Sequence, residues 1–150
     1  MKVDLRGVGQ NIQDHTYLGV SYELNPNDTH ETYDLMHNPE FAAEAERLHS
    51  KVCISFAYFP FTSATSDAPA LIKKAAESVD MLKRSGKLKP GQADILNKQI
   101  QTFKDDMLPD LEIIAFPGYF TTVTAPEAAK SYVTILIVLN HPLSHGTIYL

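Results

Sequence analysis

The sequence lacks several features that define common classes of protein. It has a single cysteine, Cys53, so no disulfide can form within the chain. Asp and Glu outnumber Lys and Arg by 18 to 13, and the formal net charge is -5. Because phosphate binding needs clustered Lys and Arg, we expect no nucleic-acid partner. Met1 to Gln10 lacks the apolar core of a signal peptide, and the longest aliphatic run, Ile135 to Leu139, is too short for a bilayer, so we expect no membrane span.

Familiar catalytic and metal-binding patterns are missing as well. His30, His37 and His49 do not have a spacing such as H-E-x-x-H, so we expect no metal site. Ser144 lies beside His145, but adjacent residues in a strand point to opposite faces, and no G-x-S-x-G motif accompanies them. The residue types alone therefore indicate neither a hydrolase nor a metalloenzyme.

What is present fits an ordinary globular fold. A length of 150 residues with 44% hydrophobic residues suits one domain. Strands are predicted at 17–24, 51–61, 111–116 and 132–139. Helices are predicted from about Thr29 to before Pro39, at 40–49, from about 68 to Gly86, and from Gly91 to before Pro109. Cys53, within one of the strand segments, is expected to be a buried small hydrophobe.

The fold class predicted from these elements is α+β. The two long middle helices are expected to pack on one face of a mostly antiparallel sheet. Their apolar stripes are Leu71, Ile72, Ala75, Val79 and Leu82 in the first helix, and Ile95, Leu96, Ile100, Phe103 and Met107 in the second. Strand 132–139 is apolar almost throughout, so we expect it to be central and covered on both faces.

The N-terminal segment is the first of two motifs. It reads Val3-Asp4-Leu5-Arg6-Gly7-Val8-Gly9-Gln10-Asn11-Ile12-Gln13-Asp14-His15. The two glycines permit a tight backbone path and a close approach to another surface. A third glycine and a preceding strand are both missing, so this is not a dinucleotide fingerprint. Spacing alone favours a turn whose Asn and Asp side chains satisfy nearby backbone groups.

The order of residue types resembles a segment of the glucose–methanol–choline (GMC) family of flavin oxidoreductases, V-D-L-P-G-V-G-x-N-L-x-D-H. Arg6 stands where the family usually has proline, and Ile12 replaces leucine. A second motif, from Leu139 to Ile148, resembles the family's N-H-P-x-S-x-G-x-[VI], with His145 at a position that is commonly arginine. The Val20-Ser21-Tyr22 segment is similar to fungal members in particular.

The resemblance implies a part of an FAD-dependent enzyme that oxidises alcohols by hydride transfer to flavin. Residues 1–16 would be a loop continuing from a missing flavin-binding domain, and residues 17–150 a partial substrate-binding domain. Both ends of the chain look cut. The family's catalytic histidine would lie beyond the chain, so His141 and His145 are not assigned that role, and no catalytic residue is expected here. FAD is implied for the whole enzyme and is not expected to bind this chain alone.

The resemblance also suggests which residues lie near cofactor or substrate. These are Gly7, Gly9, Asn11, Asp14, His15 and Tyr17. His15 and Tyr17 could line the active site, or Asp14 and His15 could only hold the loop by hydrogen bonds. A competing hypothesis is a free-standing, non-enzymatic α+β binding module that has kept the domain and lost the chemistry.

Overall fold

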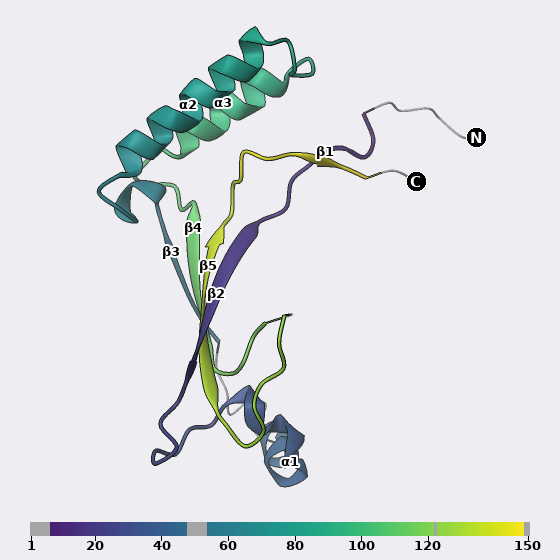
Figure 1. Ribbon diagram of the computed structural model, residues 1–150, viewed down its shortest axis with the longest axis vertical. Helices are drawn as coiled ribbons and strands as arrows, with labels where there is room; N and C mark the ends of the chain where they lie inside the picture. The colour runs from purple at the N-terminus through teal and green to yellow at the C-terminus, as the bar shows by residue number, and fades with distance from the viewer. Residues whose placement is uncertain (1–6, 48–53, 122, 149–150) are drawn as a thin grey trace, which may run out of the picture. The chain divides into compact units, whose positions relative to one another are not determined.

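The computed structural model describes residues 7–47, 54–121 and 123–148 (Figure 1). Its strands are β1 (Gln10–Ile12), β2 (Thr16–Glu23), β3 (Ser55–Phe59), β4 (Leu111–Phe116), β5 (Tyr132–Leu139) and β6 (Gly146–Thr147). Its helices are α1 (Pro39–Arg47), α2 (Ala68–Arg84) and α3 (Gln92–Thr102), with 3₁₀ turns η1 (Tyr33–His37) and η2 (Phe61–Ser63). The predicted α+β class is confirmed.

The chain divides into two compact units. The first comprises 1–16, 59–111 and 139–150, and the second comprises 17–58 and 112–138. Within the described ranges, no helix is long and apolar enough to cross a membrane.

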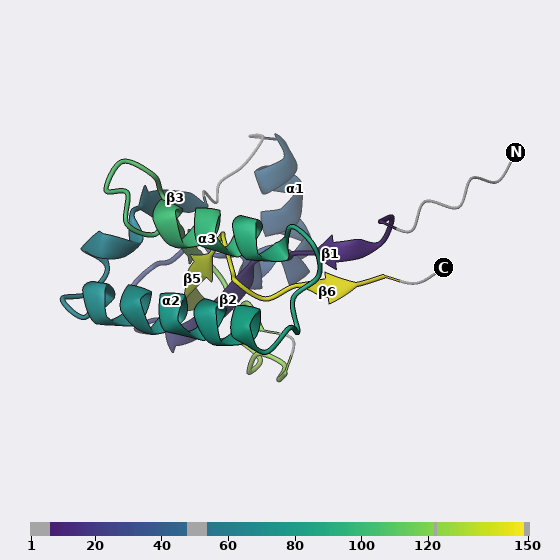
Figure 2. The ribbon, with the colours of Figure 1, turned by 90° about the horizontal axis from the view of Figure 1, so that it is seen from above.

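The first unit is built around the pair of helices α2 and α3, which lie side by side (Figures 1 and 2). Their contact buries one apolar cluster, made of Ile72, Val79, Leu96, Ile100 and Phe103. All five belong to the predicted stripes, as expected for helices that each bury one face. The outer members of the stripes are wrongly predicted, because four of them are exposed: Leu71, Leu82, Ile95 and Met107.

The ends of these helices follow from local chemistry. Asp67 precedes α2 and Pro69 lies in its first turn, where a missing amide hydrogen costs nothing. Gly91 precedes α3 with φ of +79°, a conformation that favours glycine. α3 ends at Thr102, well before Pro109, so Met107 lies outside the helix that was expected to contain it.

The second unit contains most of a four-stranded sheet in the order β2-β5-β4-β3. The Leu24 amide donates to the Ser131 carbonyl (2.8 Å), which joins the end of β2 to the start of β5 and shows that the two strands are antiparallel. The central position predicted for β5 is confirmed. Its predicted burial on both faces is wrong for the described chain, because burial alternates along the strand and Ile137 is 50% exposed.

Three local predictions need correction. The helix expected from Thr29 is only the short turn η1, because the Asp34 carboxylate accepts the amides of Tyr119 (2.9 Å) and Tyr132 (2.8 Å) and so ties this segment to the sheet. The helix expected at 40–49 is α1, which begins at Pro39. The strand expected at 51–61 is β3, which is shorter and ends before Pro60. His49 and Cys53 lie outside the described residues.

Candidate functional site

The two motifs at the ends of the sequence meet in the first unit. β1, from the first motif, pairs antiparallel with β6, from the second, with Gln10 opposite Thr147 (Figure 2). The Ile148 amide donates to the Gly9 carbonyl at 2.8 Å and continues this pairing. Backbone hydrogen bonds therefore connect the two segments that carry the family resemblance.

Gly9 is required by this pairing. Its φ is +74°, and a Cβ atom built on it would lie 2.2 Å from the Ile148 carbonyl oxygen. Gly7 has no such constraint, since no described atom lies within 4 Å of the corresponding position, and its carbonyl accepts the Gln10 amide (3.2 Å). The close approach expected of the glycines is confirmed for Gly9, and the surface it approaches is the chain's own second motif.

Side chains extend the connection. The Gln13 side-chain amide donates to the Pro142 carbonyl at 2.8 Å, and the Gln99 amide on α3 donates to the same oxygen at 3.2 Å. Gln99 Oε1 is buried and has no hydrogen-bond partner among the described residues. Sequence reasoning missed both glutamines, because nothing local marks a glutamine whose partner is a distant carbonyl.

Among the other polar residues of the first motif, Asn11 contacts another element, whereas Asp14 and His15 are exposed. Asn11, at φ of +60°, accepts a hydrogen bond from the Gln92 side chain at 3.1 Å. Its side-chain oxygen therefore contacts the start of α3 rather than nearby backbone. Asp14 and His15 both have exposed side chains.

The first motif does not fit a cradle for FAD. A pyrophosphate needs free backbone amides and space beside a glycine at the start of a helix. Here the position beside Gly9 is filled by the Ile148 carbonyl, and β1 follows in place of a helix. The described residues 7–15 therefore lack the geometry of a pyrophosphate-binding glycine loop.

A buried carboxylate lies next to the second motif. Asp110 is fully buried, and its side chain accepts the Phe61 amide (3.3 Å) and contacts His141 Nδ1 (3.2 Å). Its carbonyl accepts the Asn140 amide at 2.9 Å. Asp110 thus fixes the Asn140-His141-Pro142 segment to the start of η2. The sequence offered only a weak signal for this role, an acidic residue directly before an apolar strand.

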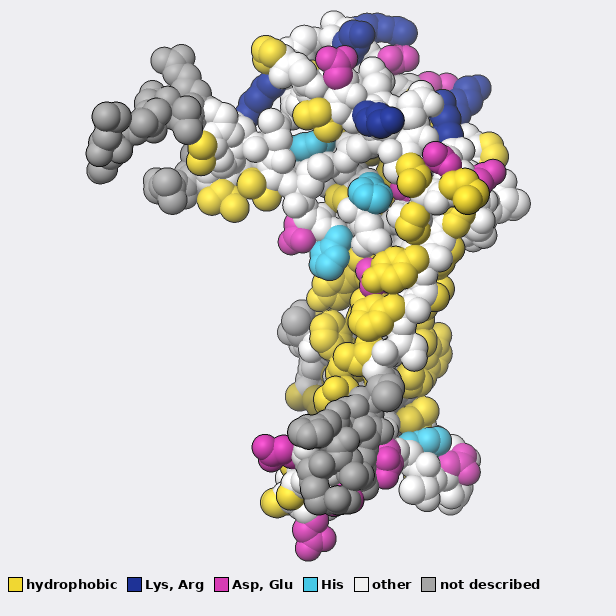
Figure 3. Space-filling view, turned by 180° about the vertical axis from the view of Figure 1, so that it is seen from behind, with side chains coloured by type: hydrophobic (Ala, Val, Ile, Leu, Met, Phe, Trp, Pro, Cys, Tyr) yellow, Lys and Arg dark blue, Asp and Glu magenta, His cyan; other side chains and the backbone are white. Residues whose placement is uncertain are grey.

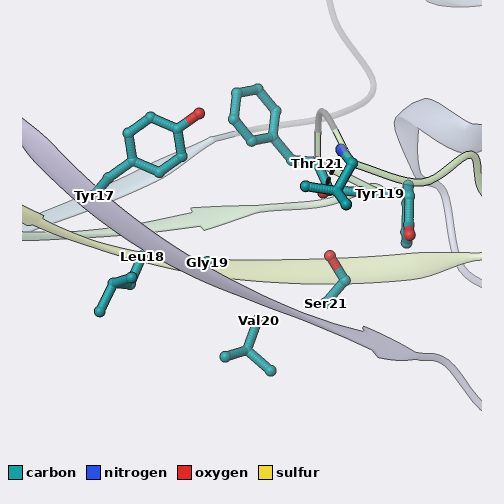
Figure 4. Close-up of a pocket in the computed structure, with 9 residues that line it drawn as sticks. Tyr17, Leu18, Gly19, Val20, Ser21, Tyr119 and Thr121 are labelled. Atoms are coloured by element: carbon teal, nitrogen blue, oxygen red, sulfur yellow. Dashed lines mark hydrogen bonds between the residues drawn. The ribbon is translucent and has the colours of Figure 1, made fainter.

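A cavity of about 470 Å³ lies in the second unit, between β2 and the loop that follows β4. Its lining is drawn in Figure 4 and consists of Tyr17, Leu18, Gly19, Val20, Ser21, Tyr119, Phe120, Thr121 and Val123. The Tyr17 ring and the Ser21 hydroxyl point from β2 toward the loop, whereas Leu18 and Val20 point away from it. Of the six residues predicted to lie near cofactor or substrate, Tyr17 is the one that lines this cavity.

A hydroxyl at the centre of the sheet holds the cavity loop in place. Thr134 is fully buried, and its Oγ1 donates to the Gly118 carbonyl (2.7 Å). The same oxygen accepts the Phe120 amide (3.1 Å) and lies 2.7 Å from the Ser21 hydroxyl. One donor and two acceptor positions of a threonine are all used, so the loop is fixed to both β5 and β2.

Aromatic rings extend from the cavity into the second unit. Tyr17 and Phe120 meet edge to face with ring centroids 6.3 Å apart, and Phe120 meets Phe116 in the same way at 5.2 Å. Phe116 stacks on Tyr33 at 5.1 Å. This packing fixes the Phe120 ring in the lining of the cavity.

A solved structure of a known protein has a similar fold. The chain superposes on an FAD-dependent oxidoreductase from Chaetomium thermophilum, solved in complex with the fragment 4-oxo-N-[(1S)-1-(pyridin-3-yl)ethyl]-4-(thiophen-2-yl)butanamide, with a TM-score of 0.62 and 22% identity. The match covers 96% of this chain and 25% of that one. The chain has the fold of a segment of that enzyme. No protein-family model matches the sequence.

A curated relative agrees with the structural match. The chain is 28% identical over 151 residues to the oxidoreductase cicC of Emericella nidulans. This alignment covers 97% of the chain and 21% of the relative, so the chain spans about a fifth of the length of that protein. Both proteins are oxidoreductases, and in each of them the corresponding segment is a small part of a larger chain.

Proposed function

We propose that the chain is part of the substrate-binding domain of an FAD-dependent oxidoreductase of the GMC type, acting on CH–OH donors. The observation that carries this proposal is the pairing of the two family-like motifs through Gly9 and Ile148 and through Gln13 and Pro142. Two matches at opposite ends of a sequence could arise separately by chance. Their direct contact indicates that they form one structural unit. The two oxidoreductases to which nearly the whole chain is similar support the same proposal.

Under this proposal the chain contributes a wall of the substrate cavity, and other parts of the enzyme hold FAD and the catalytic base. The crowded backbone at Gly9 supports this division, because it leaves no room for a pyrophosphate. The residues that line the cavity beside Tyr17 form the candidate wall. Residues 1–16 would lead in from the flavin-binding domain, and 17–150 would form the partial substrate-binding domain.

Two preparations test the proposal. We expect the 150-residue chain, mixed with FAD and passed over a desalting column, to retain no flavin absorbance and to show no alcohol-dependent turnover. The reading frame is expected to continue into a glycine-rich βαβ unit on one side and a histidine-bearing segment on the other. The product of that longer frame should retain FAD, and its flavin absorbance should bleach when an alcohol is added anaerobically.

The outcomes separate this proposal from the non-enzymatic binding module. Turnover by the 150-residue chain alone would contradict the assignment of FAD and base to other segments. A reading frame without a flavin-binding unit, together with a monodisperse and cooperatively melting chain, would favour the binding module.

A further inference from the structure

We propose that Asn27 is a site of N-linked glycosylation. The segment Asn27-Asp28-Thr29 has the pattern N-x-[ST] with a middle residue other than proline, which is the pattern that accepts an oligosaccharide in the secretory pathway. The attached glycan is bulky and hydrophilic, so an acceptor of this kind must lie at the surface of the folded protein. The site belongs to the second unit, and its assignment does not depend on the proposed oxidoreductase function.

The pattern distinguishes Asn27 from the other asparagines. The chain has six asparagines, and only Asn27 is followed two positions later by serine or threonine. Asn25, in the same loop, is followed directly by Pro26, and Asn38 is followed directly by Pro39. Asn25 therefore provides a neighbouring asparagine that the transferase should leave unmodified.

A three-residue pattern can occur by chance, so its position in the fold decides whether it is usable. Asn27 lies in the loop that joins β2 to η1 (Figure 1). The Asp28 amide donates to the Asn25 carbonyl at 3.1 Å, which closes a turn over residues 25–28. Asn27, Asp28 and Thr29 are all exposed. A glycan on Asn27 would therefore extend from a surface turn into solvent, without breaking a buried contact.

The hydrogen bonds of this turn leave Asn27 free to be modified. Asn27 Nδ2 donates to Asn25 Oδ1 at 3.2 Å, and the Asn27 backbone amide donates to the same oxygen at 3.1 Å. Nδ2 carries two hydrogens and glycosylation replaces one, so the other hydrogen can still donate to Asn25. The Thr29 hydroxyl, which the pattern requires, has no hydrogen-bond partner within the described residues and is available to the transferase.

The transfer forms one bond and breaks one. Asn27 Nδ2 loses a proton and bonds to the anomeric carbon of the first sugar. The bond between that carbon and a phosphate oxygen of a lipid-diphosphate-linked oligosaccharide breaks, and the lipid diphosphate leaves with the bonding electrons. No oxidation or reduction takes place, and the modified side chain remains a neutral amide.

Production of the 150-residue chain in yeast behind a cleavable secretory leader tests the acceptor. We expect a form that migrates more slowly in electrophoresis than the chain made in bacteria, and endoglycosidase H should abolish the difference. Release of the glycan by peptide N-glycosidase F in heavy-oxygen water should convert residue 27 into a labelled aspartate, which peptide mass spectrometry locates. These readouts are covalent, so they do not require the isolated chain to be stable.

Matched variants assign the modification to the pattern. Asn27→Gln and Thr29→Ala should each abolish the slowly migrating form, whereas Thr29→Ser should retain it, because serine also completes the pattern. Asn25→Gln is the control, since it removes a side-chain amide from the same turn and leaves the pattern intact. This control should still be glycosylated.

The proposal is overturned by a chain that stays unmodified behind the leader, or by a glycan that persists in Asn27→Gln. A second measurement concerns the product of the longer reading frame. When it is made in a eukaryotic host from its own start codon, it should carry the same glycan at Asn27, and an unmodified product would also overturn the proposal. The flavin content of that product is measured separately, so the failure of either proposal leaves the other standing.

Discussion

The Ile148 amide donates to the Gly9 carbonyl at 2.8 Å, and this hydrogen bond joins the two ends of the described chain. Gly9 adopts a positive φ at the point of contact, and the Ile148 carbonyl lies where a side chain would begin. The first motif thus has a structural role that is visible without any cofactor, the closure of the first unit.

The first prediction concerns this contact. Gly9→Ala should lower the free energy of unfolding by about 1–3 kcal/mol, because it adds both backbone strain and a clash with Ile148. Urea unfolding measures the loss, and amide hydrogen exchange at Ile148 should accelerate. Gly7→Ala is the control, since nothing lies within 4 Å of its Cβ position and its φ is not positive. Equal losses for the two variants would contradict the assigned role of Gly9.

The second prediction concerns the buried carboxylate of Asp110. Asp110→Ala should lower the free energy of unfolding by roughly 1–3 kcal/mol, because it leaves the Phe61 amide without its acceptor. The matched control is Asp106→Ala, which removes an exposed carboxylate that accepts the Thr62 hydroxyl. That control should cost less than about 1 kcal/mol. Urea unfolding midpoints compare the two, and a larger effect at Asp106 would sink the prediction.

The third prediction concerns the ionisation of Tyr58. Its hydrogen bond to the buried Glu112 carboxylate raises the pKa of the Tyr58 hydroxyl, with smaller contributions from desolvation and from the Glu112 charge. Glu112→Gln should therefore lower the Tyr58 pKa. An NMR titration of ring-labelled tyrosine measures the change, and an unchanged or higher pKa in the variant would contradict the assignment.

The same shift has a consequence for stability. Because the Tyr58 pKa is higher in the folded than in the unfolded chain, its contribution is fully present below the unfolded-state pKa of about 10. It is lost as the pH rises through the folded-state pKa. Glu112→Gln should remove this part of the alkaline loss of stability, which unfolding curves between neutral and alkaline pH measure.

The fourth prediction concerns the sheet face that points away from the cavity. Leu18 on β2 is 77% exposed and Ile137 on β5 is 50% exposed, and Figure 3 shows hydrophobic side chains gathered along the sheet. Exposed apolar sheet surface promotes association. The isolated chain should therefore associate as its concentration rises, and the double variant Leu18→Lys/Ile137→Lys should associate less.

Light scattering across a concentration series measures this association. The control is Met81→Lys, which adds the same charge at a 66% exposed position on α2. A monodisperse chain at every concentration, or equal improvement by the control, would show that this face does not drive association.

Sequence patterns located some elements well for a physical reason. The strands at Leu111–Phe116 and Tyr132–Leu139 were predicted with their observed bounds, because each is a mostly apolar segment, rich in β-branched and aromatic residues, with an abrupt polar or turn-forming boundary. The segment from Thr29 to Pro39 was mispredicted, because its conformation depends on Asp34 accepting the amides of Tyr119 and Tyr132, far along the chain.

In the candidate site, too, local patterns indicated some residues, and residues that act through distant partners were missed. The resemblance named Gly9 and Tyr17 as residues near cofactor or substrate, which stays a prediction, and it implied nothing about Asp110, Gln99 or Phe120. Each of these acts through a partner distant in sequence, and a pattern confined to neighbouring residues contains no information about such partners.

The sequence by itself therefore determined most of the segments that become strands and helices, and it supplied the two motifs that resemble a family of flavin oxidoreductases. Local backbone preference and apolar periodicity act over a few residues, and they can be read directly. Only the tertiary structure decided that Gln13 meets Pro142, 129 residues away, and that the Tyr17 ring contacts the Phe120 ring beside the cavity. Such contacts depend on which segments pair across the fold, and that choice arises from the packing of the whole chain.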